Sequence, residues 1–160
     1  MISEKLNAAL NGQIAAEMWS SNLYLSMSFC MQGAGYDGFA NWLKKQSAEE
    51  LDHALQIADY VAKRGGKPQV GKVDAVPVEW ASPKEVFNQV YEHECKVSQM
   101  INDLVRLASE ERDNATQDFL WGFVREQVEE EATTMSISEK VAKASDAALL
   151  ILDSQLGTRA

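Results

Sequence analysis

Side chains that commonly bind metals interrupt the apolar faces of four segments of this sequence. Glu50 and His53 stand three residues apart, a spacing that places both side chains on one face of a helix. The comparable carboxylates in the other three segments are those of Glu17, Glu94 and Glu130. Four carboxylates and an imidazole turned into an apolar core would each cost several kcal/mol if left unpaired. The pattern therefore predicts a shared countercharge, and a pair of metal ions is the candidate.

The ligand types indicate which metal such a layer would bind. A carboxylate-rich set with a single imidazole suits iron or manganese better than zinc, which prefers more nitrogen or sulfur. A bridging Glu50 could hold two ions about 3.5–4 Å apart, and two ferrous ions can deliver two electrons to dioxygen or hydrogen peroxide. Tyr24 lies two turns after Glu17 on the same face, where it either hydrogen-bonds a ligand or is a core tyrosine with a satisfied hydroxyl. A hydrogen-bonded polar layer without metal is the alternative for the whole set.

Five segments carry the periodicity of amphipathic helices, and none alternates as a strand would. Apolar residues recur every three or four positions through four long stretches, with the candidate ligands near the midpoints. Ser3 is an N-cap candidate, and Ser82 followed by Pro83 predicts the start of the third long helix. The expected helices span residues 4–32, 37–65, 83–110, 115–143 and 146–156. The sequence therefore predicts an all-α fold in a single domain, 1–160.

The lengths of the linkers predict how these helices are connected. The links 33–36 and 111–114 are short, so each joins two antiparallel helices. The segment 66–82 has 17 residues and can reach roughly 55 Å at ~3.3 Å per residue, whereas a 28-residue helix is about 42 Å long. This segment can run the length of a bundle and make the second and third helices parallel. A four-helix bundle with one such crossover and a short fifth C-terminal helix is the ferritin-like arrangement.

Composition limits the partners and the compartment. A chain of 160 residues that is 46% hydrophobic suits one globular domain with a full core. The formal net charge of −9 argues against nucleic acid as a partner and fits attraction of cations. Cys30 and Cys95 form no disulfide framework, and the longest apolar run, Ala147 to Leu152, is too short to span a bilayer. We therefore expect a cytoplasmic protein with no membrane or nucleic-acid partner.

The chain resembles the non-haem bacterial ferritins over its whole length. The matching residues are Glu17, the Glu49-Glu50-x-x-His53 run, His93-Glu94, Gln127-x-Glu129-Glu130-Glu131, Phe119-Leu120 and the terminal Ile151-Leu152-Asp153. The resemblance implies a ferroxidase centre in which Glu17 and His53 hold one iron and Glu50 bridges. It implies that Glu94 and Glu130 hold the other iron, with Gln127 as a hydrogen-bonding neighbour. It further implies a homo-oligomeric shell of 24 subunits that stores ferric oxyhydroxide formed from ferrous iron and oxygen or hydrogen peroxide.

Three glutamates outside the main layer are candidates for a third iron site. Glu126 and Glu129 lie on one face of the fourth long helix, and Glu49 is offset from Glu50 in the same sense. The ferritins that this chain resembles have such a site, and three solvated surface glutamates are the alternative. Leu51 stands where bacterioferritins carry the haem-ligating Met, so the expected cofactor is iron without haem.

The sequence is also compatible with two other functions. A di-iron enzyme that activates oxygen or peroxide on an organic substrate is one alternative, although the chain offers no segment for a substrate domain. The other is a structural helical bundle whose polar layer only sets the register of the helices.

His93 is expected at the surface.

Overall fold

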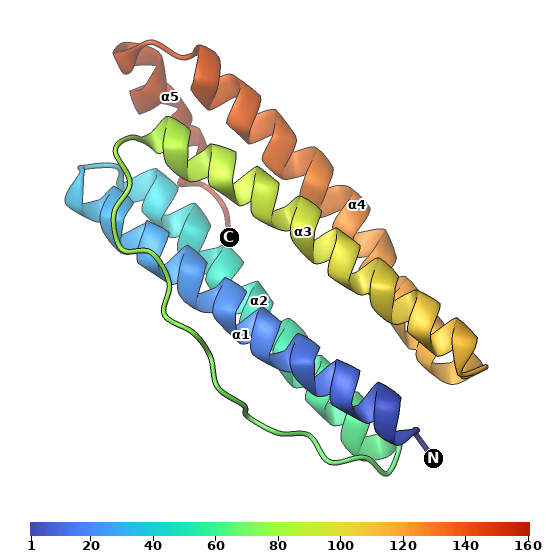
Figure 1. Ribbon diagram of the computed structural model, residues 1–160. Helices are drawn as coiled ribbons and strands as arrows, with labels where there is room; N and C mark the ends of the chain where they lie inside the picture. The colour runs from blue at the N-terminus through green and yellow to red at the C-terminus, as the bar shows by residue number, and fades with distance from the viewer.

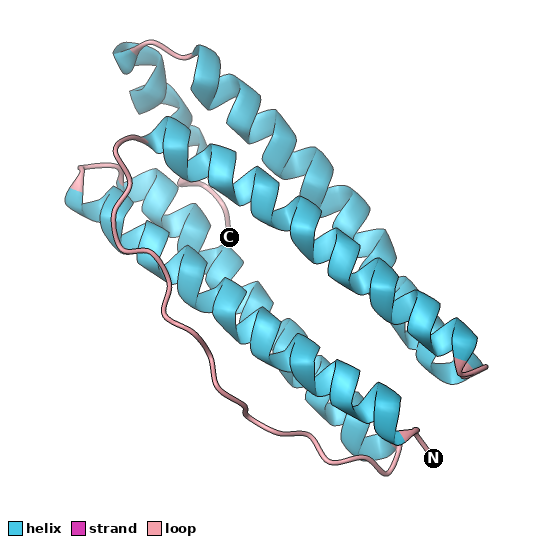
Figure 2. Ribbon diagram, in the orientation of Figure 1, coloured by secondary structure: helices cyan, strands magenta, loops and turns pink.

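The computed structural model describes all 160 residues and contains five helices and no strands (Figure 1 and Figure 2). The helices are α1 (Glu4–Gly33), α2 (Asp37–Lys63), α3 (Pro83–Glu110), α4 (Asn114–Lys143) and α5 (Asp146–Leu156). The four long helices form the bundle, and α5 lies at one end of it. The all-α bundle with a short fifth helix, predicted from the sequence periodicity, is confirmed. No helix in the structure is both long and apolar enough to cross a lipid bilayer.

One long connection sets the topology of the bundle. The chain leaves α2 and follows the outside of α1 back to the opposite end, so α2 and α3 run in the same direction (Figure 1). Side chains of α1 hold this crossover in place. The hydroxyl of Ser26 donates to the carbonyl of Pro77 at 2.6 Å, and the indole of Trp19 donates to the carbonyl of Ala75 at 3.4 Å. The extended connection predicted from its length is therefore the one observed.

Local chemistry fixes the helix ends, which differ from the predicted bounds by at most two residues. The helix α2 ends at Lys63, because Gly65 adopts a φ of 76° that terminates the helical turn. The helix α4 begins at Asn114, since the carboxylate of Asp113 accepts a bond from the Thr116 amide at 2.9 Å and caps the helix. The Arg64 guanidinium also donates to both oxygens of Asp113, at 3.1 and 2.9 Å, and ties the end of α2 to the start of α4.

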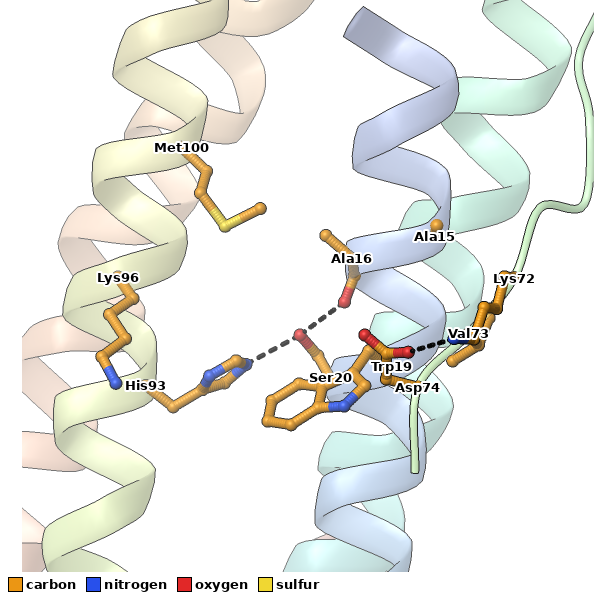
Figure 3. A pocket seen from close by; sticks show the side chains of 10 residues that line it. All are labelled: Ala15, Ala16, Trp19, Ser20, Lys72, Val73, Asp74, His93, Lys96 and Met100. Carbon is orange, nitrogen blue, oxygen red and sulfur yellow. Dashed lines mark hydrogen bonds and ion pairs between the residues drawn. The ribbon is translucent and has the colours of Figure 1, made fainter. Parts of the chain in front are cut away.

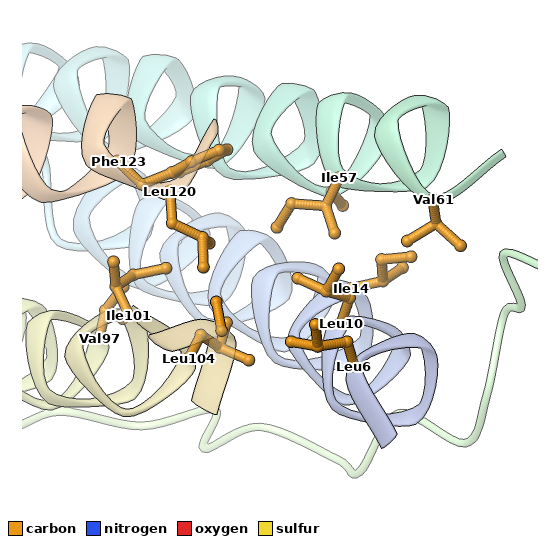
Figure 4. Packing of buried hydrophobic residues seen from close by; sticks show 12 residues of the cluster. Leu6, Leu10, Ile14, Ile57, Val61, Val97, Ile101, Leu104, Leu120 and Phe123 are labelled. Carbon is orange, nitrogen blue, oxygen red and sulfur yellow. The ribbon is translucent and has the colours of Figure 1, made fainter. Parts of the chain in front are cut away.

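The apolar interior consists of two clusters that lie on either side of a polar layer. Each cluster contains 12 buried residues contributed by all four long helices. The first, shown in Figure 4, includes Leu10, Ile57, Ile101 and Leu120. The second is rich in aromatic side chains, with Phe39 and Phe87 edge to face at 5.1 Å. Between the clusters, every long helix contributes buried polar side chains, and this layer carries the candidate ligands.

The short helix α5 packs against the start of α2. A carboxylate oxygen of Asp153 accepts a bond from the backbone amide of Phe39 at 2.8 Å, which satisfies a free amide in the first turn of α2. The backbone of α5 approaches Gly38 so closely that a Cβ there would lie 1.8 Å from the Asp153 carbonyl oxygen. Gly38 is therefore required by the packing of two backbones.

We expect Gly38→Ala to destabilise the protein by about 1–3 kcal/mol, because α5 must move away from α2 to admit the methyl group. Urea unfolding of the variant would measure this loss. Gly12→Ala is the matched control, since nothing lies within 4 Å of a Cβ at Gly12 in the middle of α1. The control should be stabilised by up to ~1 kcal/mol through helix propensity. Equal stability of the Gly38→Ala variant and the wild type would contradict this account of the α5 contact.

Candidate metal centre

Three potential ligands converge in the polar layer between α1 and α2. Glu17 comes from α1, and Glu50 and His53 come from successive turns of α2. Each can offer one ligand atom, and these atoms lie within 4.8 Å of one another. All three side chains are buried, with exposed fractions of 1%, 2% and 5%. The helical spacing puts Glu50 and His53 on one face, and the antiparallel packing of α1 brings Glu17 to the same level.

One oxygen of Glu17 has no hydrogen-bond partner. The Gln13 amide donates to Oε1 of Glu17 at 2.8 Å, but Oε2 is buried without any donor. A buried acceptor without a donor costs about 1–3 kcal/mol, and more when the group is charged. The unpartnered oxygen belongs to the same carboxylate that lies beside Glu50 and His53. A cation bound by these three side chains would satisfy this oxygen, so the residues present fit a metal.

Burial raises the pKa of several acidic groups of this layer. It raises the pKa of Glu17 well above its usual range, and the nearby Glu50 carboxylate raises it further. Burial also raises the pKa of Glu50, and it raises that of Glu94 to about 7 in spite of two hydrogen bonds that stabilise the anion. Clustered carboxylates of this kind are the expected consequence of a site whose countercharge is a bound cation.

His53 is oriented by carboxylates on both sides of its ring. Its Nδ1 faces Oε2 of Glu50 at 3.4 Å, and its Nε2 lies 2.9 Å from Oε1 of Glu126 on α4. Burial lowers the pKa of His53, but the bonds to Glu126 and Glu50 outweigh burial and raise the pKa to about 11. A carboxylate on the far nitrogen is the usual partner of a metal-binding imidazole, because it fixes the ring and increases its basicity. Glu126, which the sequence suggested for a third iron, therefore contacts His53 directly.

Two further carboxylates are joined by a single amide. The side-chain nitrogen of Gln46 donates to Oε2 of Glu130 at 2.9 Å and to Oε1 of Glu94 at 3.5 Å. The Tyr24 hydroxyl also donates to Glu94, and the Gln127 amide donates to Oε2 of Glu94 at 3.1 Å. Tyr24 and Gln127 thus both act as hydrogen-bonding neighbours of one carboxylate. Burial raises the pKa of Glu130 as it does that of Glu94.

The remaining predicted residues are less closely gathered. The carboxylate of Glu49 pairs with Arg159 at 2.8 Å, and Glu49 shares with Glu126 and His53 the lining of a cavity of about 370 Å³. Glu129 is exposed on α4. The sequence placed Gln46 on the same helix face as Glu50 and His53 but gave it no role, and it did not point to Arg159 as a neighbour of the site. Gln46 continues the helical spacing of Glu50 and His53 and could have been found by that signal, whereas nothing local pointed to Arg159.

His93, which was expected at the surface, is half-buried between α1 and α3. Its Nε2 lies 2.7 Å from the Ser20 hydroxyl, and the ring packs against Trp19 at 5.4 Å and Tyr24 at 5.8 Å between ring centroids. Figure 3 shows the imidazole reaching from α3 toward Ser20 on α1, beside a cavity of about 380 Å³. Burial lowers the pKa of His93 to about 4, and the charge of Lys96 adds to this effect. His93 is a neutral imidazole between α1 and α3.

We expect Glu126→Ala to weaken cation binding at Glu17, Glu50 and His53 by about 10–100-fold, because the imidazole loses the carboxylate that orients it. Anaerobic calorimetric titration with ferrous iron would measure the change in affinity. Asp118→Ala, an exposed carboxylate two turns earlier on α4, should bind as the wild type does. Wild-type affinity in the Glu126→Ala variant would show that the contact with His53 has no part in metal binding.

The sequence and the fold match known proteins over nearly the whole chain. The ferritin-like domain family matches residues 7–144. A bacterial non-heme ferritin from Bacteroides fragilis is 60% identical, over 99% of this chain and 100% of that protein. One from Escherichia coli is 33% identical, over 99% of this chain and 97% of the relative. A solved structure from Archaeoglobus fulgidus, described as a novel open pore ferritin, is 46% identical and covers 100% of both chains with a TM-score of 0.98.

The helical bundle with its crossover and its buried carboxylate–histidine layer defines the class of the protein. The chain belongs to the ferritin-like family, and within it to the bacterial non-haem ferritins. This membership supports iron storage as the function, with a carboxylate–histidine cluster able to bind metal.

Proposed function

We propose that this protein oxidises ferrous iron at an intrachain di-iron ferroxidase centre and stores the ferric product as an oxyhydroxide mineral inside a shell of 24 subunits. Glu17 and His53 hold one iron, and Glu50 bridges to the second. Glu94 and Glu130 hold the second iron. Gln127 and Tyr24 keep the Glu94 carboxylate in place through their hydrogen bonds.

The observation that carries the proposal is the convergence of Glu17, Glu50 and His53, together with a buried oxygen of Glu17 that has no hydrogen-bond partner. In the oxidation, two ferrous ions give up two electrons. These reduce dioxygen to hydrogen peroxide with two protons, or hydrogen peroxide to two water molecules with two protons. The substrate ions are held side by side, so that both electrons are delivered to one oxidant molecule.

A third iron site is part of the proposal. It is formed by Glu49, Glu126 and Glu129, and iron bound there lies between the di-iron pair and the mineral. The support is the cavity that Glu49 and Glu126 line together beside His53, whose other lining residues are mostly polar or charged. A lining of that kind suits a hydrated cation better than an organic substrate, and it therefore disfavours an enzyme that acts on organic molecules.

Exposed apolar side chains support assembly of the shell. The helix α5 has no buried residue in the isolated chain, and Leu150 and Ile151 are 61% and 62% exposed. Other large apolar side chains are exposed along the bundle, namely Phe29, Leu51, Leu55, Trp121 and Val128. Apolar surface of this extent is typical of protein–protein contacts. The free thiols of Cys30 and Cys95 suit the reducing cytoplasm, which is the compartment that we propose.

One experiment with two measurements tests the proposal. Size-exclusion chromatography should show a particle of about 425 kDa, the mass of 24 chains of 17.7 kDa. Anaerobic titration should then show ferrous iron bound at two or three sites per chain, and addition of oxygen or hydrogen peroxide should oxidise it within the particle. A monomer or dimer in solution would overturn the shell, and ferrous iron that oxidises no faster than in buffer would overturn the ferroxidase.

A further inference from the structure

The last residues of the chain fold back across the start of α2. The side chain of Asn41 donates to the backbone carbonyls of Gly157 and Arg159, at 3.4 and 3.2 Å. The Arg159 amide donates to the Leu156 carbonyl at 3.3 Å, which continues the end of α5. These bonds hold the tail against α2 one to two turns before Glu49, so that the Arg159 side chain reaches the polar layer.

The guanidinium of Arg159 contacts three oxygen acceptors and one aromatic ring at this position. It pairs with Oε1 of Glu49 at 2.8 Å, and it donates to the carbonyl of Trp42 at 3.1 Å and to Oε1 of Gln46 at 3.0 Å. It also lies over the Trp42 ring, 4.7 Å from the ring centroid. An isolated surface ion pair contributes little, but a planar guanidinium with three oxygen acceptors and an indole face is held in one geometry.

Only one amide separates Arg159 from the carboxylates of the proposed second iron. Because Arg159 donates to the oxygen of the Gln46 amide, the nitrogen of that amide must face Glu130 and Glu94, and it donates to both. The buried Gln46 therefore has its orientation fixed from both ends. The Arg159 guanidinium is therefore linked, through the Gln46 amide, to the carboxylates proposed to bind metal cations.

Arg159 is also placed beside the cavity that adjoins His53. Glu49, His53, Glu126 and the chain's last residue, Ala160, all line that cavity. Glu49 is the carboxylate there that already has a strong cationic partner from the tail, since the guanidinium occupies its Oε1. A metal cation that uses Glu49 must compete for the same carboxylate.

We propose that Arg159 acts as a gate on the Glu49 side of the metal centre: its guanidinium occupies the cation position at Glu49, and a metal ion binds Glu49 only when the guanidinium moves off that carboxylate. This inference rests on the proposed function, because it concerns the third of its cation positions. No covalent bond is made or broken in this exchange: a divalent metal ion takes the place of the monovalent guanidinium at the carboxylate. A planar guanidinium bound to Trp42 and Gln46 keeps neutral acceptors when it leaves Glu49, so the tail need not detach.

The test compares Zn²⁺ binding in the assembled wild type and three variants, by calorimetry and by anomalous scattering from crystals soaked in Zn²⁺. Zinc is used because it is redox-inert, and the readout is the position and affinity of each ion. Arg159→Gln should bind Zn²⁺ at Glu49 at least about tenfold more tightly than the wild type, because it removes the competing charge. The double variant Arg159→Gln with Glu49→Gln should lose this gain. Arg106→Gln is the control, since Arg106 is exposed and pairs only with Asp103 on its own helix.

The possible results support or overturn the gate, the proposed function, or both. A gain at Glu49 that disappears in the double variant supports the gate. An unchanged affinity at Glu49 in Arg159→Gln overturns it, and so does an equal gain in Arg106→Gln, which would reflect net charge alone. A wild type that binds Zn²⁺ at Glu17, Glu50 and His53 while Arg159→Gln shows no gain overturns the gate and leaves the proposed function standing. A wild type with no Zn²⁺ at those three residues overturns both.

Discussion

Replacing Glu50 with Ala is expected to slow rapid ferrous oxidation by about 100-fold or more, since even the loss of an outer partner of a metal ligand costs 10–100-fold. Glu50 is the residue proposed to contact both irons, and its carboxylate lies within 4.8 Å of ligand atoms of Glu17 and His53. Without a bridge, two ferrous ions repel each other with no shared anion between them. Stopped-flow measurement of iron oxidation after oxygen or peroxide addition would record the loss.

The fold should survive this substitution. Burial raises the pKa of Glu50, which means that the ionised form is unfavourable in the folded state without a cation. Removing it therefore takes away an unfavourable charge, although Ala leaves a cavity. Glu50→Gln keeps the volume and should show the same loss of oxidation, which separates the ligand role from packing. Asp59→Ala, an exposed change on α2, is the control. Wild-type oxidation rates in both Glu50 variants would rule out the bridge.

Metal binding should release protons, and its affinity should rise steeply with pH. In the metal-free site Glu17 has a strongly raised pKa, Glu94 one of about 7, and His53 one of about 11. All three must lose their protons to act as ligands. At pH 6–7 we therefore expect about two to three protons to leave when two ferrous ions bind, and each released proton makes the affinity about tenfold higher per pH unit. Anaerobic calorimetry in two buffers of different ionisation enthalpy counts these protons.

A variant can assign one of the protons. Glu17→Gln has no acidic proton to lose at that position, so it should release about one proton fewer than the wild type at pH 6. His93 should contribute none, because burial keeps its pKa near 4 and the ring is already neutral. Identical heats in the two buffers would mean that binding releases no protons, which would contradict the raised pKa values of these groups.

The sign of these pKa shifts also fixes how the metal-free protein responds to pH. A carboxyl whose pKa is higher in the folded state than in the unfolded state contributes stability that is lost as the pH rises through the folded pKa. The shift of Glu94 to about 7 therefore weakens the metal-free fold between its unfolded value and neutral pH. Bound cations remove this penalty, because ligand binding to the folded state stabilises it.

Much of the fold and the convergence of Glu17, Glu50 and His53 could be predicted from the sequence, because both follow from helical spacing. The three-residue step between Glu50 and His53 fixes their shared face, and the length of the crossover predicts the parallel course of α2 and α3. The structure brings Glu17 to these two residues, as the matched positions in neighbouring helices suggested. The resemblance to ferritins agrees with the family found by comparison.

What could not be predicted depends on side chains that meet across the bundle. The contact of Glu126 with His53 joins α4 to α2 over 73 residues, and the ion pair of Arg159 with Glu49 brings the chain end to α2. No local pattern specifies which of several acidic residues a buried imidazole or a tail guanidinium will choose. The partial burial of His93 could not be predicted for a related reason, since it arises from the packing of α3 against Trp19 and Ser20 of α1.

We expect the division of the apolar interior into two clusters to affect how cooperatively the bundle unfolds locally. Without metal, the halves on either side of the polar layer are joined by continuous helices and by hydrogen bonds such as that of Tyr24 with Glu94. Cations held by side chains from all four long helices would clamp the bundle at its midpoint. Amide hydrogen exchange should then report two partly independent regions in the metal-free protein and one cooperative unit in the loaded protein. The opening of the bundle would thus depend on whether cations occupy its polar layer.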